Sequence, residues 1–119
     1  RATILGDAAH PMLPFLSQGA AMAIEDGYVL AAALEQFGEN VAAALSAYEA
    51  ERRPRTSQVQ LQARERGRTY HLSTPEELAA RDEAYRQAQR DNPNAVGIKA
   101  EWVYEYDALS CVQRNKWAA

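Results

Sequence analysis

The sequence of 119 residues contains a single cysteine, Cys111. One cysteine excludes an internal disulfide framework and a zinc site built from several thiolates. It also favours a reducing compartment, so we expect a cytoplasmic protein. No run of about twenty apolar residues is present to span a bilayer, and the N terminus lacks the basic stretch and apolar core of a signal peptide. We therefore expect no membrane partner.

Large apolar side chains are also scarce. Hydrophobic residues make up 47% of the sequence, but 24 residues are alanine, and leucine, isoleucine, valine and phenylalanine total only 21. Such a chain builds only a thin core. The net charge of -3 is nevertheless small, and alanine is the strongest helix former. Length and composition therefore predict one folding unit that is mainly α-helical.

A short N-terminal strand is predicted before the helices. Residues 2–5 form an apolar, β-branched run that stops at Gly6 and Asp7, a pattern typical of a strand that ends at a loop. An isolated strand leaves its backbone amides and carbonyls unpaired, and the rest of the sequence supplies no obvious partner strand. A strand that begins directly after Arg1 without a sheet suggests a piece of a longer protein.

Four or five helices are predicted to follow. Residues 19–34 are apolar nearly all the way round, as in a helix buried in an interior. Gly38 can end this helix with a positive φ, and Asn40 can cap the next one. Residues 41–53 carry an apolar stripe at helical spacing and predict a second helix.

Proline and a capping signal divide the later part of the chain. Pro54 is expected to break or bend the second helix, or to begin a new one, because it lacks an amide hydrogen. Residues 58–70 contain good helix formers with weak periodicity. Thr74, Pro75 and Glu77 form a start signal for a surface helix that reaches to about residue 90.

The aromatic tail leaves two interpretations open. Trp102, Tyr104 and Tyr106 alternate as they would in a strand, whereas Trp102 and Tyr106 also have the spacing of one helix face. The pattern does not separate these alternatives.

Charge is distributed unevenly along the chain. Residues 1–50 hold one arginine and six acidic residues, whereas residues 52–68 hold six arginines and one glutamate. A basic helix can contact nucleic acid or a membrane. Aromatic residues are not interleaved with these arginines, and the whole chain is acidic, so a solvated face with long side-chain stems is the preferred interpretation and no nucleic-acid partner is expected.

Residues 6–27 carry the most informative pattern, GDAAHPMLPFLSQGAAMAIEDG. Asp7 directly follows the predicted strand, and the carboxyl ends of strands in open α/β sheets face the crevice where ligands bind. A carboxylate only accepts hydrogen bonds, so Asp7 suits a hydroxyl-bearing ligand. Gly19 allows a ligand to approach the first amides of the next helix, whose positive end favours an electron-rich group.

This segment resembles the second flavin-contacting motif of the class A flavoprotein monooxygenases, the salicylate hydroxylase-like aromatic hydroxylases that use FAD and NAD(P)H. The resemblance is carried by His10, Pro11, Pro14, Gln18, Gly19, Glu25 and Asp26, all in register. Residues 48–54 and 102–107 are also similar to later segments of this family.

The resemblance implies roles for five residues. Asp7 would accept a hydrogen bond from the ribityl chain of FAD. Ala20 and Ala21 would present backbone amides to the pyrimidine carbonyl of the isoalloxazine, and Gly19 before them would help to hold the cofactor. Pro14 would lie beside the ring, next to the aromatic substrate. No residue of this sequence is assigned a catalytic role, and no metal is implied. NAD(P)H serves as the reductant in the family.

The sequence departs from the family in lacking its phosphate-binding Gly-x-Gly-x-x-Gly, because no two of the six glycines come within two positions of each other. We therefore interpret the chain as the C-terminal part of such an enzyme, an α/β FAD-binding fold. Residues 1–36 would end the FAD-binding domain, and residues 37–119 would form a C-terminal helical region. The main partner would be the missing N-terminal part, and this piece alone is expected to be inactive. The alternative is a stand-alone helical interaction module that retains the motif without the activity. Because no sheet covers its apolar helix, the fragment could also form a dimer with a second copy of itself.

Other candidate residues have structural interpretations. His10 could be a base, but packing or bonding within its loop is favoured because no nucleophile accompanies it in a recognisable arrangement. Glu25 and Asp26 point about 100° apart on a helix, so we expect them to bind backbone or arginine rather than share a proton. His71 is expected on the surface, since two histidines sixty or so residues apart make a poor metal site.

Overall fold

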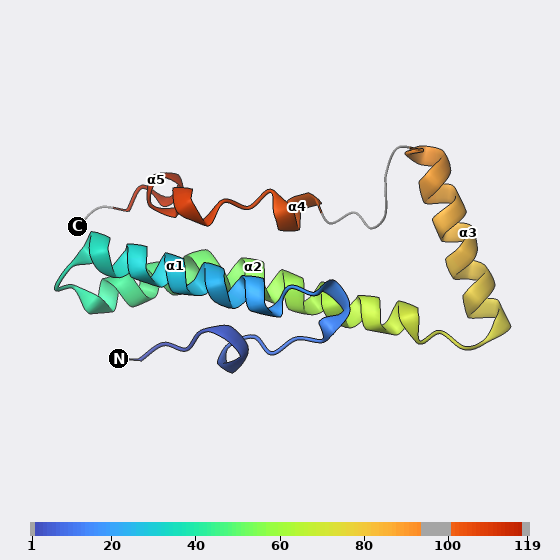
Figure 1. The fold of residues 1–119 in the computed structure, drawn as a ribbon, viewed down its shortest axis with the longest axis horizontal. Coiled ribbons are helices and arrows are strands. Elements are labelled where there is room, and N and C mark those ends of the chain that lie inside the picture. Colours follow the sequence, from blue (N-terminus) through green and yellow to red (C-terminus); the bar gives the residue numbers. More distant parts are fainter. Residues whose placement is uncertain (1, 94–100, 118–119) are drawn as a thin grey trace.

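The computed structural model describes residues 2–93 and 101–117. This part of the chain forms the helices α1 (Gly19–Phe37), α2 (Val41–Tyr70), α3 (Pro75–Asp91), α4 (Glu101–Tyr104) and α5 (Cys111–Asn115), with the short 3-10 turns η1 (Gly6–Ala8), η2 (Pro14–Leu16) and η3 (Ala108–Ser110). Helices α1 and α2 form a hairpin, with the N-terminal segment on one side and residues 101–117 on the other (Figure 1). The prediction of a mainly helical chain is confirmed.

The corner between α1 and α2 forms as its residues predict. Gly38 ends α1 with a φ of +51°, a left-handed conformation that glycine adopts without strain. Asn40 caps α2, because its side-chain oxygen accepts a hydrogen bond from the amide of Ala43 at 3.2 Å. The tight corner sets the two helices antiparallel.

The core between the hairpin and the tail is thin. Its buried residues are Val29 and Ala33 of α1, Ala44 and Tyr48 of α2, and Cys111 of α5. Two of these five are alanines, in keeping with the composition. Each buried contact therefore involves little apolar area, and polar contacts have a larger share in holding the elements together.

Helix α2 does not end at Pro54, so the predicted boundary there is wrong. The helix is continuous over 30 residues with Pro54 inside it. A proline in a helix interior removes one backbone hydrogen bond and costs about 3 kcal/mol. The flanking residues Arg52 and Arg55 are both buried in ion pairs with α1, and these tertiary contacts stabilise the helix through the proline.

The predicted strand at residues 2–5 is also wrong. These residues are extended, with Leu5 at φ -141° and ψ 170°, but the described part of the chain holds no strand for them to pair with. They bind α2 instead: the Thr3 hydroxyl donates to Glu49 at 3.0 Å, and the Tyr48 hydroxyl donates to the Ile4 carbonyl at 3.3 Å. Extended conformation is local, whereas a strand needs a neighbour.

Helix α3 begins as predicted and lies on the surface as predicted. The Thr74 hydroxyl accepts from the Glu77 amide at 3.2 Å while the Glu77 carboxylate accepts from the Thr74 amide, a complete capping box. None of its residues is buried. It stands away from the hairpin (Figure 1).

The aromatic tail is helical over Trp102 and Tyr104, which lie in α4, while Tyr106 lies beyond its end. The strand alternative is therefore wrong. Helix α3 ends at residue 91, close to the predicted end at about residue 90. No helix in the described ranges is both long and apolar enough to span a bilayer.

Candidate functional site

A buried cluster of charges lies where the N-terminal turn, α1 and α2 meet. Asp26 of α1 is 0% exposed and accepts three hydrogen bonds: from the Gly6 amide at 2.9 Å, from His10 Nε2 at 2.5 Å and from Arg52 Nε at 2.7 Å. Burial acts to raise the pKa of Asp26, but Arg52, the Gly6 amide and His10 together hold this pKa below its ordinary value. Asp26 is therefore a fixed carboxylate that joins three segments.

Glu25, the neighbouring acid, forms a second set of ion pairs. Its carboxylate lies 2.7 Å from Arg52 Nη1 and accepts from Arg55 Nε and Nη2, both at 2.8 Å. The prediction that Glu25 and Asp26 bind arginine is confirmed. The two carboxylates are bridged by Arg52, and Glu25 is bound by Arg55 as well, so both are engaged by guanidinium groups rather than by each other.

The basic segment is not simply a solvated face, as the sequence suggested. Arg52 is 2% exposed and Arg55 is 8% exposed, whereas Arg53, Arg64 and Arg68 are exposed. Two arginines are buried because two carboxylates stand opposite them on α1. The opposite charges of residues 1–50 and 52–68 were the signal that could have found this cluster.

The charge cluster also holds the turn that carries Asp7. Gly6 donates its amide to Asp26 and has a φ of +57°. A Cβ at Gly6 would stand 3.4 Å from Ala23 Cβ, so the backbone of the turn lies directly on α1. His10 is buried and its partner is on α1 rather than in its own loop. Both ends of the turn from residue 6 to residue 10 are therefore bound to Asp26 of α1.

Asp7 and Gly19, two of the predicted flavin residues, lie together. Asp7 is exposed in η1, and its Oδ1 atom is 4.0 Å from the place where a Cβ at Gly19 would stand. Gly19 is the first residue of α1, and the preceding Gln18 gives no side-chain cap. The first amides of α1, on Gly19, Ala20 and Ala21, have no acceptor within the helix, since the first bond across this end runs from Met22 to Gln18.

Pro14, the fifth predicted residue, lies in a segment that packs on a different helix from the segment that carries Asp7. It is exposed in η2, which packs on α2, whereas η1 packs on α1. The loop of residues 11–18 therefore runs from the turn that carries Asp7, across α2, to the start of α1.

The tail is fastened to the other side of α2. Arg55 donates to the Val103 carbonyl at 2.8 Å and stands 4.1 Å above the Tyr106 ring. The Tyr106 hydroxyl donates to Glu51 at 2.7 Å, and Glu51 also pairs with Arg114. Burial and Glu51 raise the pKa of Tyr106 to about 12, so its hydroxyl remains a donor at neutral pH.

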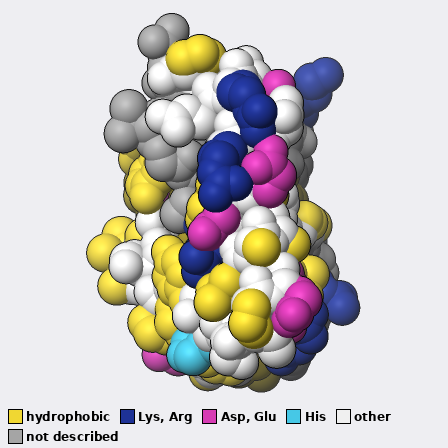
Figure 2. Space-filling model, turned by 90° about the vertical axis from the view of Figure 1, so that its right-hand side faces the viewer, with side chains coloured by type: hydrophobic (Ala, Val, Ile, Leu, Met, Phe, Trp, Pro, Cys, Tyr) yellow, Lys and Arg dark blue, Asp and Glu magenta, His cyan; other side chains and the backbone are white. Residues whose placement is uncertain are grey.

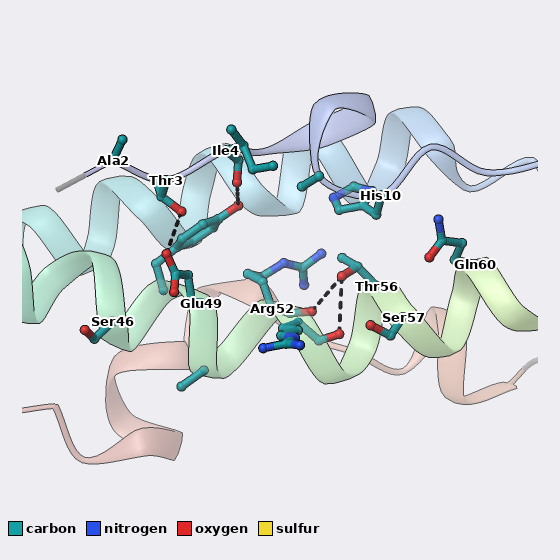
Figure 3. A pocket seen from close by; sticks show the side chains of 14 residues that line it. Ala2, Thr3, Ile4, His10, Ser46, Glu49, Arg52, Thr56, Ser57 and Gln60 are labelled. Atoms are coloured by element: carbon teal, nitrogen blue, oxygen red, sulfur yellow. Dashed lines mark hydrogen bonds between the residues drawn. The ribbon is translucent and has the colours of Figure 1, made fainter.

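A cavity of about 670 Å³ lies between the N-terminal segment and α2. Figure 3 shows Thr3, Ile4 and His10 on one wall and Glu49, Arg52, Thr56 and Gln60 of α2 on the other. Neither Asp7 nor Gly19 lines it. The cavity is therefore separate from the predicted flavin residues.

Comparison with known proteins shows the family of this chain. The family described as "FAD binding domain" matches residues 1–63, and the chain belongs to it. The resemblance inferred from residues 6–27 is thus confirmed.

The chain is similar to several curated proteins. It is 42% identical over 108 residues to 3-amino-4-hydroxybenzoate 2-monooxygenase PtmB3 of Streptomyces platensis, covering 91% of this chain and 26% of the relative. It is 35% identical over 115 residues to 3-hydroxybenzoate 6-hydroxylase of Polaromonas naphthalenivorans, covering 97% and 28%. It is 36% identical over 107 residues to the FAD-dependent monooxygenase ntnJ of Nectria sp, covering 86% and 26%. The chain thus spans about a quarter of the length of these relatives.

Proposed function

We propose that this chain is the C-terminal part of a cytoplasmic FAD- and NAD(P)H-dependent monooxygenase that hydroxylates a salicylate-like aromatic compound. The observation that carries the proposal is that the Asp7 carboxylate lies beside Gly19, at the N terminus of α1, which has no side-chain cap. The names of the relatives, which include two enzymes of hydroxybenzoates and one FAD-dependent monooxygenase, support the same class of reaction.

The donor and acceptor set at this place fits FAD. Asp7 is exposed and offers only acceptors, as a ribityl hydroxyl requires, and the amides of Ala20 and Ala21 offer donors to a flavin carbonyl. Gly19 adds no side chain between them. The positive end of α1 stabilises negative charge on such a ligand by an amount on the order of 1 kcal/mol.

FAD, when bound, supplies the redox chemistry that amino-acid side chains lack. This chain would help to position the cofactor and would supply the electrostatic field of the α1 N terminus. Asp7 and the α1 amides would hold the cofactor, and Pro14 would lie on the loop that faces the aromatic substrate. The chain by itself would be inactive, because it contains no Gly-x-Gly-x-x-Gly to hold the phosphates. The boundary proposed between residues 36 and 37 stays a prediction.

The partner we propose is the preceding part of the same polypeptide, which would supply the α/β sheet. One face of α1 exposes apolar side chains, including Ile24 at 73% and the half-exposed Tyr28 and Leu34. Ile4 and Leu5 of the extended segment are exposed as well. A helix with apolar residues on its outer face is typical of one covered by further protein. A second copy of this chain is the alternative occupant.

The test is FAD affinity in the full-length polypeptide that contains this chain. Asp7→Asn removes the charge while keeping the shape, and we expect FAD to bind about tenfold more weakly, since a hydrogen bond to a charged group contributes about 1.5–3 kcal/mol. Glu76→Gln, which removes an exposed carboxylate from the first turn of α3, serves as the matched control and should leave the affinity unchanged. Equal affinities in the two variants would remove Asp7 from the site.

A further inference from the structure

Gly67 occupies a place in α2 where glycine has no conformational reason to be. It lies inside the helix, and its φ is not positive, unlike those of Gly6 and Gly38. Glycine in a helix interior is less stable than alanine by about 0.5–1 kcal/mol. Glycine at this position is therefore explained by a neighbouring group that leaves no room for a Cβ atom, rather than by backbone conformation.

The space above Gly67 is filled by an aromatic ring. A Cβ at Gly67 would stand 2.5 Å from Cε2 and 2.7 Å from Cδ2 of Phe15, and 3.5 Å from Cδ1 of Leu13. Real Cβ atoms essentially never approach another heavy atom within 3.0 Å. The ring of Phe15 therefore lies against the bare backbone of α2, and an alanine methyl group would displace it.

The ring is held in that place by its other neighbours. Tyr70 and His71 both meet it edge-on, with ring centroids 5.7 Å and 5.6 Å away. The Nδ1 atom of His71 lies 2.6 Å from the Gly67 carbonyl, which fixes this imidazole beside the ring. Because aromatic neighbours occupy two sides, the ring cannot turn aside without breaking these contacts.

Phe15 is close in sequence to the start of α1. It is the middle residue of η2, which is closed by a hydrogen bond of 2.9 Å from the Ser17 amide to the Pro14 carbonyl. Ser17 follows with a φ of +54°, and α1 begins two residues later. Upstream, Gln60 donates to the Pro11 carbonyl at 2.7 Å. The loop of residues 11–18 is thus attached to α2 at Gln60 and at Gly67.

We propose that Gly67 is a positioning residue for the flavin site: by having no side chain it seats Phe15, and Phe15 sets the loop that carries Pro14 and leads into the amides of Gly19, Ala20 and Ala21. This inference rests on the proposed function. Gly67 itself touches no proposed ligand and acts only through Phe15.

The first test uses the 119-residue chain and hydrogen exchange. In Gly67→Ala we expect the amides of Ser17 and Met22, which donate to the Pro14 and Gln18 carbonyls, to exchange about tenfold faster, while amides near the Gly38 corner keep their rates. Gly27→Ala is the matched control, because Gly27 is also inside a helix and nothing lies within 4 Å of its added Cβ. Unchanged exchange at Ser17 and Met22, or an equal acceleration along all of α1 and α2, would overturn the proposal.

Phe15→Leu keeps the proposal testable if Gly67→Ala does not fold. The smaller side chain gives up the ring contacts and should speed exchange over the same residues. In the Phe15→Leu background, adding Gly67→Ala should cause little further change, since the two substitutions break one contact. Fully additive effects would contradict the seating of Phe15 by Gly67.

The second test measures FAD binding in the full-length polypeptide. We expect Gly67→Ala to raise the FAD dissociation constant about tenfold, because small displacements of positioning groups have large effects on a site. Failure of the unsubstituted polypeptide to bind FAD would refute the proposed function. FAD binding that is equal in the unsubstituted and Gly67→Ala polypeptides would refute only the role of Gly67.

Discussion

Helices α2 and α3 are built from similar residues and have opposite environments. Both are rich in arginine, glutamate and alanine, yet α2 buries nine of its residues and α3 buries none. The arginines of α2 nearest α1 face Glu25 and Asp26, whereas in α3 the arginines pair with acids of the same helix, such as Arg86 with Glu83 at 2.8 Å. Figure 2, seen from the side of α3, shows basic, acidic and hydrophobic side chains interspersed. Composition therefore does not decide whether an arginine is buried; the carboxylates that stand opposite it do.

The largest effect should come from breaking the buried cluster. In Asp26→Ala, Arg52 loses a partner while it remains buried, and such a loss costs about 3–5 kcal/mol. We therefore expect the variant to be largely unfolded even without urea. Urea titrations that follow helix content by circular dichroism measure the loss of stability. Glu83→Ala in α3 removes an exposed acid with two arginine partners and should shift the free energy of unfolding by at most about 1 kcal/mol. If the two variants lost similar amounts of unfolding free energy, the ion pairs of α2 and α3 would not differ in their contribution to stability.

A second contrast concerns packing. Ala33 is fully buried between α1 and the elements around it, so Ala33→Leu overfills the thin core and should destabilise the chain by about 1–3 kcal/mol. The same substitution at the exposed Ala84 of α3 should change stability by less than about 0.5 kcal/mol. Thermal unfolding of the two variants measures the difference. A tolerated Ala33→Leu would mean that the core is loosely packed.

The pH dependence of unfolding should reveal the buried cluster at Asp26 and the contacts of Glu51 with the tail. The pKa values of Asp26 and Glu51 are held below the ordinary values of 3.8 and 4.5 in the folded chain. The unfolded chain therefore binds more protons at acid pH, and the stabilisation present at neutral pH is lost as the pH falls below about 4.5 towards the folded-state values. Denaturant titrations between neutral pH and acid pH measure this slope. In Asp26→Asn the slope should be smaller, and an unchanged slope would show that other groups cause it.

The smallest effect is expected at the start of α3. Thr74→Ala removes the acceptor of the Glu77 amide and should cost α3 about 1 kcal/mol. Because α3 buries no residue, the loss should appear as faster exchange of amides in residues 75–80 without a change in unfolding of the hairpin. A shift in the midpoint of the whole chain would show that α3 and the hairpin unfold together.

The success of the sequence-based predictions depended on how far apart the interacting residues lie. The Gly38 end, the Asn40 cap and the Thr74 capping box formed as predicted, because each depends on residues within about four positions. The binding of Glu25 and Asp26 to arginine was anticipated as a type of contact. The arginines that bind Glu25 and Asp26 are Arg52 and Arg55, and the sequence analysis had assigned both to a solvated face.

The candidate site divides in the same way. The motif at residues 6–27 led to the correct family, and Asp7 and Gly19 were named before their proximity was visible. Gly67 and Phe15 gave no comparable signal, since 52 residues of chain separate them and neither is unusual in its local sequence.

Local chemistry was sufficient to place the end of α1 at Gly38, the starts of α2 and α3 and the surface position of α3, because these follow from short-range hydrogen bonds and side-chain types. The passage of α2 through Pro54, the unpaired state of residues 2–5 and the burial of two arginines were decided by packing between distant segments. A proline penalty or a buried charge is offset only when a specific partner stands opposite, and that partner is brought there by the fold.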